Sequence, residues 1–294
     1  MKRKYAEAAE RLRGPSGFEE RYASLFSGRW PLLRKALCAE GIYSSLDFGG
    51  SESYYLDPAS VCAALCLPVK GRRRLLDLCA APGGKTLVLA GNMDDDAVLY
   101  SNERSPSRKL RLSEVVGRVL PAETAGRIVL SCSDGATWCR RGQDCYDAVL
   151  LDAPCSSERH LLADEKYLKE WSPARIRSLA MEQWALLSCA WRLLAPGAYV
   201  LYATCALSPE ENGGLVERLQ KKFPAARLAD KVELALHFEE NLASFTGTIG
   251  AQDGPSLREV FASAESVGGG LHILPDASQG AGPLFFALLQ KPAG

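Results

Sequence analysis

The stretch RLLDLCAAPGGKT, residues 74–86, decides the fold class of this chain. Its first part, RLLDLC (74–79), has the length and composition of a buried β-strand. A tight turn with two glycines follows, and the chain then continues as a helix. In an open α/β sheet such a turn brings backbone N–H groups to the carboxyl end of a strand, where ligands bind. The stretch therefore predicts a nucleotide-binding α/β unit.

Four further apolar runs follow at the spacing of an α/β domain: AVLYS (97–101), RIVLS (127–131), DAVLLD (147–152) and AYVLYAT (198–204). Helix-like stretches separate them, notably 105–119 and 173–194. Strands rich in Val, Leu and Ile that alternate with helices predict a parallel sheet covered on both faces. We therefore expect a doubly wound, Rossmann-like α/β fold, closed by a last strand in PLFFALLQ (283–290).

The expected domain organisation has two parts. Residues 1–70 are helical and basic in pattern, with an amphipathic RWPLLRKAL (29–37), and are predicted to form a small N-terminal subdomain. Residues 71–294 are predicted to form the α/β domain. Within it, 241–270 is rich in Gly, Ser and Ala and is expected to be a loop or insertion.

The charge is balanced overall, with 35 basic and 35 acidic side chains, but it is unevenly distributed. Residues 1–35 hold nine Lys or Arg against four Glu, whereas residues 230–276 hold eight acids against two basic residues. This excludes a general polycation but allows a local basic surface for phosphates. The N-terminal basic residues and Arg72, Arg73 and Arg74 are the candidates for that surface.

The ten cysteines do not indicate a metal site. No Cys-x-x-Cys occurs, and the three histidines lie far apart in the sequence, so no metal is expected. Eight cysteines are interpreted as packing residues or, for Cys79, as part of a tight turn. No apolar run approaches the roughly 20 residues of a membrane span, and the basic start carries Glu7 and Glu10. We expect a cytoplasmic, monomeric protein that does not contact membranes.

The turn after the first strand excludes two phosphate-binding motifs by its spacing. A Walker loop needs a glycine where Cys79 stands, and a Gly-x-Gly-x-x-Gly turn is absent. The residues instead match acid-x-small-x-small-x-Gly, the first motif of S-adenosylmethionine enzymes, through Asp77, Cys79, Ala81 and Gly83.

Acids after the next two strands support this interpretation. Glu103 lies 20 positions after Gly83, which is the separation expected for an acid that binds ribose hydroxyls. Asp134 and Gly135 follow the third strand and could contact the adenine edge. A single acid at a strand end is more often a helix cap, but three acids after three consecutive strands favour a cofactor site.

Two cysteines follow the fourth and fifth strands, so both are expected at the same sheet edge as the turn. Cys155 follows Asp152, Ala153 and Pro154, and Cys205 follows Thr204. A thiolate that adds to carbon 6 of cytosine makes carbon 5 nucleophilic enough to accept a methyl group. Lys85 is the candidate cation that lowers a thiol pKa, and Asp152 is the candidate carboxyl at the base edge.

The motifs DLCAAPGGKT, LLDAPCSSERH and YATCALSPEEN resemble those of the Sun-domain (Fmu/NOL/NOP) RNA 5-methylcytosine methyltransferases. The likeness runs from about residue 29 to 218 and resumes at the closing strand. RWPL (29–32), NERSPSR (102–108) and residues 152–160 are most similar to the compact branch that includes the mitochondrial ribosomal-RNA enzyme. It implies a class I methyltransferase fold, S-adenosylmethionine as cofactor, and a cytosine of structured RNA, either ribosomal or transfer RNA, as substrate. A partly assembled ribosomal subunit is a further candidate partner.

The resemblance also implies roles for single residues. Cys205 is the expected nucleophile, Cys155 is expected to assist product release, and Lys85 and Asp152 complete the expected catalytic group. The expected cofactor contacts are Cys79, Ala80, Ala81, Pro82, Gly83, Gly84, Lys85, Glu103, Arg108, Asp134, Gly135 and Asp152. Ala206 and Ala198 depart from the Ser and Gly usual in the family, but neither change removes a group that the chemistry needs.

Two other functions are compatible with the fold. A ribosome-assembly factor that binds RNA without catalysis would have no need for two thiols at one sheet edge. A methyltransferase for proteins or small molecules would not explain Cys205. We therefore expect an RNA 5-methylcytosine methyltransferase.

Overall fold

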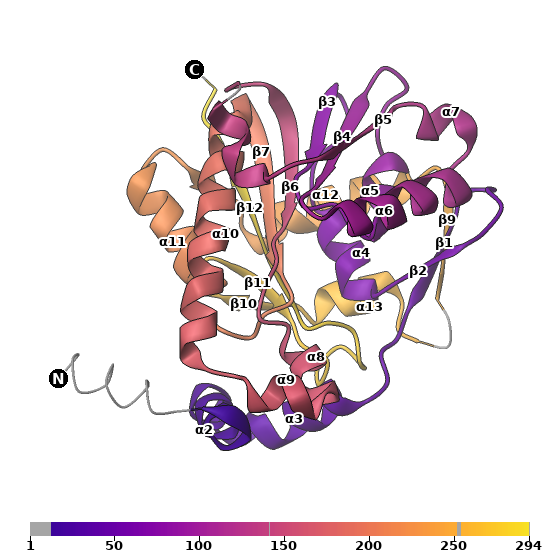
Figure 1. The fold of residues 1–294 in the computed structure, drawn as a ribbon. Coiled ribbons are helices and arrows are strands. Elements are labelled where there is room, and N and C mark those ends of the chain that lie inside the picture. The colour runs from indigo at the N-terminus through magenta and orange to yellow at the C-terminus, as the bar shows by residue number, and fades with distance from the viewer. Residues whose placement is uncertain (1–12, 141, 252–253, 294) are drawn as a thin grey trace.

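The computed structural model describes residues 13–140, 142–251 and 254–293, and Figure 1 shows their arrangement. The basic residues at positions 2, 3, 4 and 11, which belong to the predicted N-terminal subdomain, lie outside the described residues. Within the described ranges, no helix is both long enough and apolar enough to cross a membrane.

A nine-stranded sheet forms the centre of the molecule and contains the predicted strands. Its parallel part consists of β3 (Arg74–Asp77), β4 (Val98–Glu103), β5 (Ile128–Cys132), β6 (Tyr146–Asp152) and β7 (Leu194–Thr204). An antiparallel part follows β7 and consists of β12 (Leu284–Gln290), β11 (Gly270–Ile273), β10 (Glu265–Val267) and β8 (Arg227–Leu228). From β3 the chain proceeds to β4 and β5 on one side and then to β6 and β7 on the other. The topological switch point, where ligands bind in such sheets, therefore lies between β3 and β6.

Helices cover both faces of the sheet, as predicted (Figure 1). One face packs against α4 (Pro58–Leu65), α5 (Gly84–Ala90), α6 (Pro106–Val119), α12 (Lys231–Ala243) and α13 (Leu257–Ala262). The other packs against α10 (Pro173–Leu193) and α11 (Gly213–Lys222). Successive strand residues point to opposite cores: Leu75 and Leu150 face the first, whereas Leu76 and Leu151 face the second. Burial on both faces explains why these strands are continuous apolar runs rather than alternating ones.

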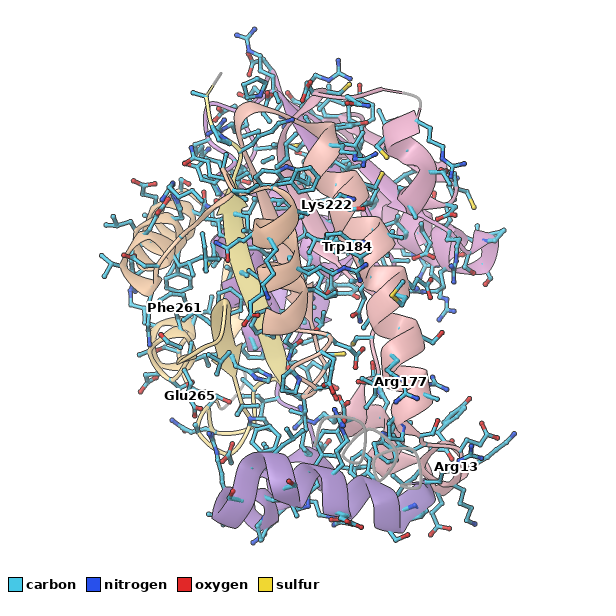
Figure 2. The ribbon with its side chains drawn as sticks, turned by 90° about the vertical axis from the view of Figure 1, so that its left-hand side faces the viewer. Arg13, Arg177, Trp184, Lys222, Phe261 and Glu265 are labelled. Atoms are coloured by element: carbon cyan, nitrogen blue, oxygen red, sulfur yellow. The ribbon has the colours of Figure 1, made fainter. Side chains whose placement is uncertain are left out.

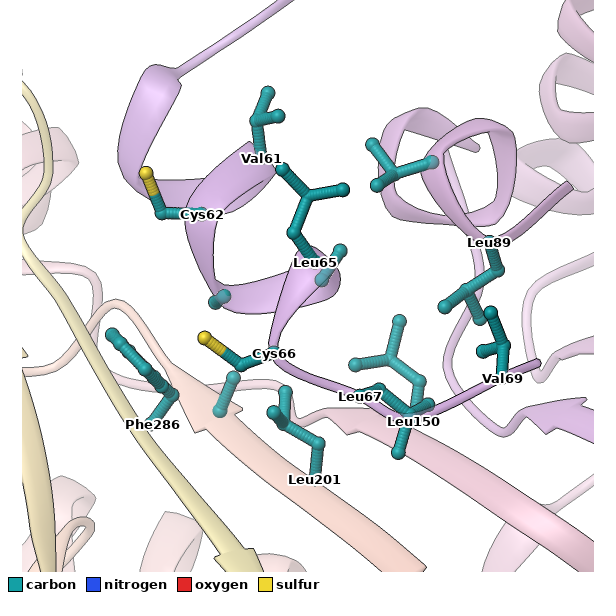
Figure 3. Close-up of a cluster of buried hydrophobic side chains, with 14 of the residues drawn as sticks. Val61, Cys62, Leu65, Cys66, Leu67, Val69, Leu89, Leu150, Leu201 and Phe286 are labelled. Carbon is teal, nitrogen blue, oxygen red and sulfur yellow. The ribbon is translucent and has the colours of Figure 1, made fainter. Parts of the chain in front are cut away.

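Several cysteines pack in these cores as predicted. Figure 3 shows Cys62 and Cys66 of the α4 segment among apolar side chains such as Leu201, and both thiols are fully buried. Cys189 of α10 is buried in the opposite core. The packing interpretation is wrong for Cys38 and Cys132, which are exposed near the ends of a helix and an edge strand, where no second layer covers them.

Helices α10 and α11 contact each other through cation–π interactions of the Trp184 side chain. Trp184 of α10 lies beside Lys222 of α11 in Figure 2. The guanidinium carbon of Arg218 is 4.1 Å from the centroid of the Trp184 ring, and the Lys222 ammonium is 5.5 Å from it. Cation–π contacts of this kind hold α11 against α10.

The N-terminal helices form a separate aromatic cluster at one end of the molecule (Figure 1). They are α2 (Gly14–Phe26), the 3-10 turn η1 (Ser27–Arg29) and α3 (Trp30–Cys38), and they pack with α8 (Glu158–Ala163) and α9 (Glu165–Lys169). The rings of Tyr22 and Trp30 stack at 5.3 Å, and Trp171 closes the cluster. Residues 39–70 do not share this cluster, because α4 packs in a core of the central sheet.

The segment 241–270, expected to be a loop or insertion, contains regular secondary structure. It contains the end of α12, strand β9 (Thr248–Ala251), helix α13 and strand β10. β9 pairs with β1 (Ser44–Asp47), which also pairs with β2 (Tyr54–Leu56), to form a small sheet. A capping box between Ser256 and Glu259 starts α13 despite the low helix propensity of its surroundings. Small residues are needed here because a Cβ at Gly270 would lie 2.5 Å from the Phe286 carbonyl oxygen.

The uneven charge distribution partly serves contacts within the chain. Arg29 of the basic segment donates to Asp276 at 2.6 Å and to Glu265 at 2.7 Å, both of the acidic segment. Arg21 similarly pairs with Glu210. The asymmetry therefore joins the N-terminal helices to the C-terminal half, which sequence pattern alone did not indicate.

The basic run before β3 is not next to the predicted cofactor edge. Arg74 begins β3 and Asp77 ends it, so the run lies at the opposite edge of the sheet from the turn. Arg72 packs over the Tyr199 ring at 5.2 Å, and Arg73 pairs with Asp96 at 3.0 Å. The run therefore lies one strand length away from the cofactor turn, and its place in a phosphate-binding surface stays a prediction.

Candidate active site

The site forms where the parallel strands end. The turn 78–83 follows β3, Glu103 ends β4, and the two predicted cysteines follow β6 and β7. Asp134 lies beyond β5, at the start of the 3-10 helix η2 (Gly135–Arg140). All predicted site residues thus lie along one edge of the sheet.

The turn after β3 depends on its glycines. Gly83 has a φ of +125°, which side-chain-bearing residues rarely adopt, and a Cβ there would lie 3.1 Å from Leu112 of α6. Asp77 supports the turn from below, because its Oδ2 accepts a hydrogen bond from the Thr86 hydroxyl at 2.7 Å. Burial raises the pKa of Asp77 to about 7, and the Thr86 hydrogen bond opposes that increase.

A cavity of about 480 Å³ lies beside the ends of β3, β4 and β5. Its lining includes the predicted contacts Cys79, Glu103, Arg108, Asp134 and Gly135. Glu103 is almost completely buried; Ser105 N–H donates to its Oε1 at 2.8 Å, and Arg108 approaches its Oε2 at 3.3 Å. Asp134 accepts from the Ala136 N–H at 3.0 Å, so it caps the following turn and also borders the cavity.

A second cavity of about 630 Å³ lies at the ends of β6 and β7. Lys85, Asp152 and Cys205 line it, together with Pro82. A third, small space of about 50 Å³ borders both cavities. It shares the lining residue Cys79 with the first cavity and Asp152 with the second. Its other lining residues include the remaining small residues of the turn, namely Ala80, Ala81 and Gly84.

Lys85 and Asp152 form an ion pair at the junction of these spaces. The Lys85 Nζ lies 2.7 Å from Asp152 Oδ2 and 3.0 Å from the Ser60 hydroxyl of α4. Burial alone would lower the pKa of Lys85, but the Asp152 carboxylate raises it above its ordinary value, with Cys205 adding to this effect. Lys85 therefore stays protonated in the lining that it shares with Cys205. That it lowers a thiol pKa stays a prediction.

The two predicted cysteines contact each other. Their Sγ atoms are 2.9 Å apart, both are free thiols, and the Ser157 hydroxyl lies 3.1 Å from Cys205 Sγ. The hydrogen bond with Cys205, followed by burial, raises the pKa of Cys155 well above its ordinary value. Cys155 therefore holds its proton and can donate a hydrogen bond to Cys205. Of the two thiols, that of Cys205 lines the large cavity.

Several residues of the site did not emerge from the sequence. Asp57 and Ser60, at the start of α4, line the large cavity, although they were assigned to the N-terminal subdomain. Glu158 and Glu211 are fully buried behind the cysteines. Glu158 occurs in the motif SSERH and Glu211 in the motif SPEEN. Their roles become apparent only from their contacts in the structure.

Comparison with known proteins identifies the family. The family model described as 16S rRNA methyltransferase RsmB/F matches residues 64–289, which is more than half of the chain. The chain belongs to this family. The match begins within α4 and ends in β12, so the RsmB/F region includes the strands of the central sheet and the whole lining of the 480 Å³ cavity. Part of the lining of the 630 Å³ cavity, including Asp57 and Ser60, precedes the matched region.

Curated relatives agree with the RsmB/F assignment. The chain is 34% identical over 253 residues to the 5-cytosine rRNA methyltransferase NSUN4 of Xenopus tropicalis, covering 83% of this chain and 57% of that protein. It is 32% identical over 212 residues to the ribosomal RNA small subunit methyltransferase F of Erwinia tasmaniensis, covering 67% and 44%. The chain thus spans about half the length of these relatives.

A solved structure supports the fold. A methyltransferase homolog protein from Pyrococcus horikoshii superposes with a TM-score of 0.67 at 20% identity, over 96% of each chain. The predicted methyltransferase-type α/β fold is therefore confirmed for this RsmB/F member.

Proposed function

We propose that this protein transfers a methyl group from S-adenosylmethionine to carbon 5 of a cytosine in structured RNA, through a covalent bond to Cys205. One observation carries the proposal: the Cys205 thiol lines a cavity beside the Lys85–Asp152 pair and contacts a second thiol, that of Cys155. A methyltransferase that acts on oxygen or nitrogen atoms needs no such thiol pair. The family match and the names of the curated relatives support the same reaction.

The residues at the sheet edge fit S-adenosylmethionine. The 480 Å³ cavity has the size of small-molecule sites, and the almost buried Glu103 borders it with a carboxylate suited to ribose hydroxyls. Residues 79–85 would bind the amino-acid part, with Asp134 and Gly135 at the adenine. When bound, the cofactor would supply an electrophilic methyl group.

Cys205 is the proposed nucleophile. Its thiolate adds to carbon 6 while nitrogen 3 of the cytosine takes up a proton from solvent, and the Asp152 carboxylate accepts a hydrogen bond from that N–H. The ring becomes an enamine whose carbon 5 is nucleophilic. Protonated Lys85 stabilises the Cys205 thiolate by its charge. After methylation a base removes the carbon 5 proton, the bond between carbon 6 and sulfur breaks, and the aromatic ring is restored.

Cys155 is the proposed residue for product release. Its raised pKa keeps it protonated against Cys205, so it can share a proton with the sulfur that departs from the base. Replacement of Cys155 by Ala is expected to accumulate the covalent adduct between protein and RNA.

The proposed substrate is ribosomal RNA, with transfer RNA as the competing choice and a partly assembled ribosomal subunit as the candidate physiological form. The base must leave its stack to reach Cys205, which costs least at an unpaired position. His160 is exposed at the border of the large cavity and is situated to meet RNA there. The neighbouring Arg159 also lines the cavity, but its guanidinium donates to backbone carbonyls of this chain. We propose that the protein acts as a monomer.

The test combines three cysteine variants with a methylation map. Bisulfite sequencing of total RNA with and without the protein should reveal one lost 5-methylcytosine. Cys205→Ala should abolish methylation in vitro, Cys155→Ala should trap RNA covalently on denaturing gels, and Cys132→Ala, an exposed control, should behave as wild type. Trapping by Cys205→Ala with normal turnover of Cys155→Ala would reverse the roles.

The alternative function is an RNA-binding ribosome-assembly factor without catalysis. Binding of S-adenosylmethionine without methyl incorporation into any cellular RNA would favour it. An unchanged methylation map would likewise contradict the catalytic proposal.

A further inference from the structure

The two thiols lie beyond the part of the sheet that could hold them together. β6 and β7 pair up to Asp152 and Ala203, and one further hydrogen bond joins Ala153 N–H to the Ala203 carbonyl at 2.9 Å. Cys155 and Cys205 follow in segments without regular secondary structure, here named the Cys155 loop (153–157) and the Cys205 loop (205–212). The strand ladder therefore does not determine the separation of the sulfur atoms.

Two buried carboxylates join these loops reciprocally. Glu211, within the Cys205 loop, accepts a hydrogen bond from the Ser156 N–H of the Cys155 loop at 2.9 Å. Glu158, directly after the Cys155 loop, accepts one from the Leu207 N–H of the Cys205 loop, also at 2.9 Å. Each glutamate thus belongs to one side and binds the backbone of the other. The two bonds flank the contact between the sulfur atoms.

Neighbouring elements hold both carboxylates in place. Gln183 of α10 donates from one Nε2 to Glu211 at 2.9 Å and to the Pro154 carbonyl at 2.8 Å. The Tyr22 hydroxyl of α2 lies 2.5 Å from Glu158, which also accepts from the Ser156 hydroxyl. Glu211 is therefore connected to α10, and Glu158 is connected to the N-terminal helix α2.

We propose that Glu158 and Glu211 are positioning residues that clamp the Cys155 and Cys205 loops together and keep the two thiols in contact. The proposal rests on the proposed two-thiol function. Neither carboxylate lines the cavities, so neither touches substrate or cofactor. Two buried carboxylates are costly to a folded chain, and packing alone would be better served by apolar side chains. Carboxyl oxygens that each accept a backbone N–H of the opposite loop instead fix one loop against the other.

The chemistry of Glu211 allows a test that separates charge from hydrogen bonding. One oxygen of Glu211, Oε1, accepts both of its hydrogen bonds, while Oε2 has no partner among the described residues. Glutamine at this position keeps the accepting oxygen and removes the charge, whereas methionine removes both at similar size. A difference between Glu211→Gln and Glu211→Met therefore reports the acceptor alone.

The experiment measures how readily the two thiols form a disulfide in the absence of RNA. Diamide takes two electrons and two protons from a pair of thiols, leaving a disulfide and its own hydrazine. The rate of Cys155–Cys205 disulfide formation in the full chain is followed by peptide mass spectrometry. Wild type and Glu211→Gln should react at similar rates, and Glu211→Met should react about tenfold more slowly, since tenfold corresponds to about 1.4 kcal/mol, within the value of such a bond.

Further variants keep the test decisive if one protein fails to fold. Glu158→Gln and Glu158→Met form the same pair on the other side of the clamp. Tyr22→Phe removes only a hydroxyl, which contacts Glu158 and also Ser208 of the Cys205 loop, and should slow the reaction about threefold. Glu233→Gln, whose partner Arg227 lies far from the thiols in the fold, is the remote control and should match wild type.

The outcomes distinguish the clamp from the proposed function. Equal disulfide rates in the folded Gln and Met variants would overturn the clamp, even if the wild type methylates RNA. Slower Met variants support it, even if no RNA is methylated and the proposed function fails. In a methylating protein the Met variants should also lower kcat more than they raise KM, because they displace a thiol rather than the RNA.

Discussion

The unfolding free energy of the wild type is expected to fall as pH rises toward 7, because Asp77 titrates. The Asp77→Asn variant should lack this part of the pH dependence. Asp77 is buried under the cofactor turn, and burial raises its pKa from 3.8 to about 7. The folded protein therefore holds a proton that the unfolded chain releases at neutral pH. The stabilisation from that proton is fully present below the unfolded pKa and is lost as pH rises through about 7.

The magnitude follows from the two pKa values. Between pH 5 and pH 8 the wild type should lose roughly 2–3 kcal/mol of unfolding free energy that the variant keeps, at about 1.36 kcal/mol per pKa unit. Asparagine keeps an oxygen that can accept from the Thr86 hydroxyl, so the main change is the loss of a titrating group. Other raised groups, such as Glu211, are present in both proteins and cancel in the difference.

Urea unfolding of both proteins at pH 5, 6, 7 and 8, followed by circular dichroism, measures the effect. The difference between variant and wild type should grow in favour of the variant up to about pH 7 and then level off. A difference that stays constant across this range would refute the reasoning, because Asp77 would then titrate alike in both states.

Three other substitutions test the turn, the N-terminal cluster and the ion pair. Gly83→Ala should cost about 1–3 kcal/mol and weaken S-adenosylmethionine binding in calorimetry, because φ is +125° and the Cβ would approach Leu112; wild-type affinity would contradict this. Trp171→Ala, at a position only 1% exposed, should lower the unfolding free energy by about 3–5 kcal/mol in urea. Lys85→Met should leave Asp152 without its cation and lower methylation in a radiolabel assay about a hundredfold or more; a folded variant with normal rates would exclude Lys85 from the chemistry.

The local pattern of the sequence was sufficient to predict the strands and the edge at which the site forms. Apolar runs buried on both faces differ clearly from amphipathic helices, and in parallel strands the residues after each run must meet at one edge. The pattern therefore predicted that Glu103, Asp134, Cys155 and Cys205 lie along a single edge. It did not indicate the regular structure within 241–270, where strand β9 depends on pairing with a distant segment rather than on local propensity.

Charge was the least predictable property. The basic N-terminal segment suggested phosphate contacts, yet Arg29 pairs with Asp276 and Glu265, more than two hundred residues away. Sequence composition reports which charges exist but not which of them neutralise each other, because pairing depends on how the chain folds back.

The sequence by itself determined the chemistry that this protein can perform: a cofactor turn, an acid one strand later, and two thiols at the ends of adjacent strands. Residue types and short-range spacing are enough for this, since strand and turn geometry are local properties. Only the tertiary structure decided how the thiols meet. Their 2.9 Å contact and the crossed bonds of Glu158 and Glu211 join separate loops, and such contacts arise from packing between segments that the local pattern does not relate.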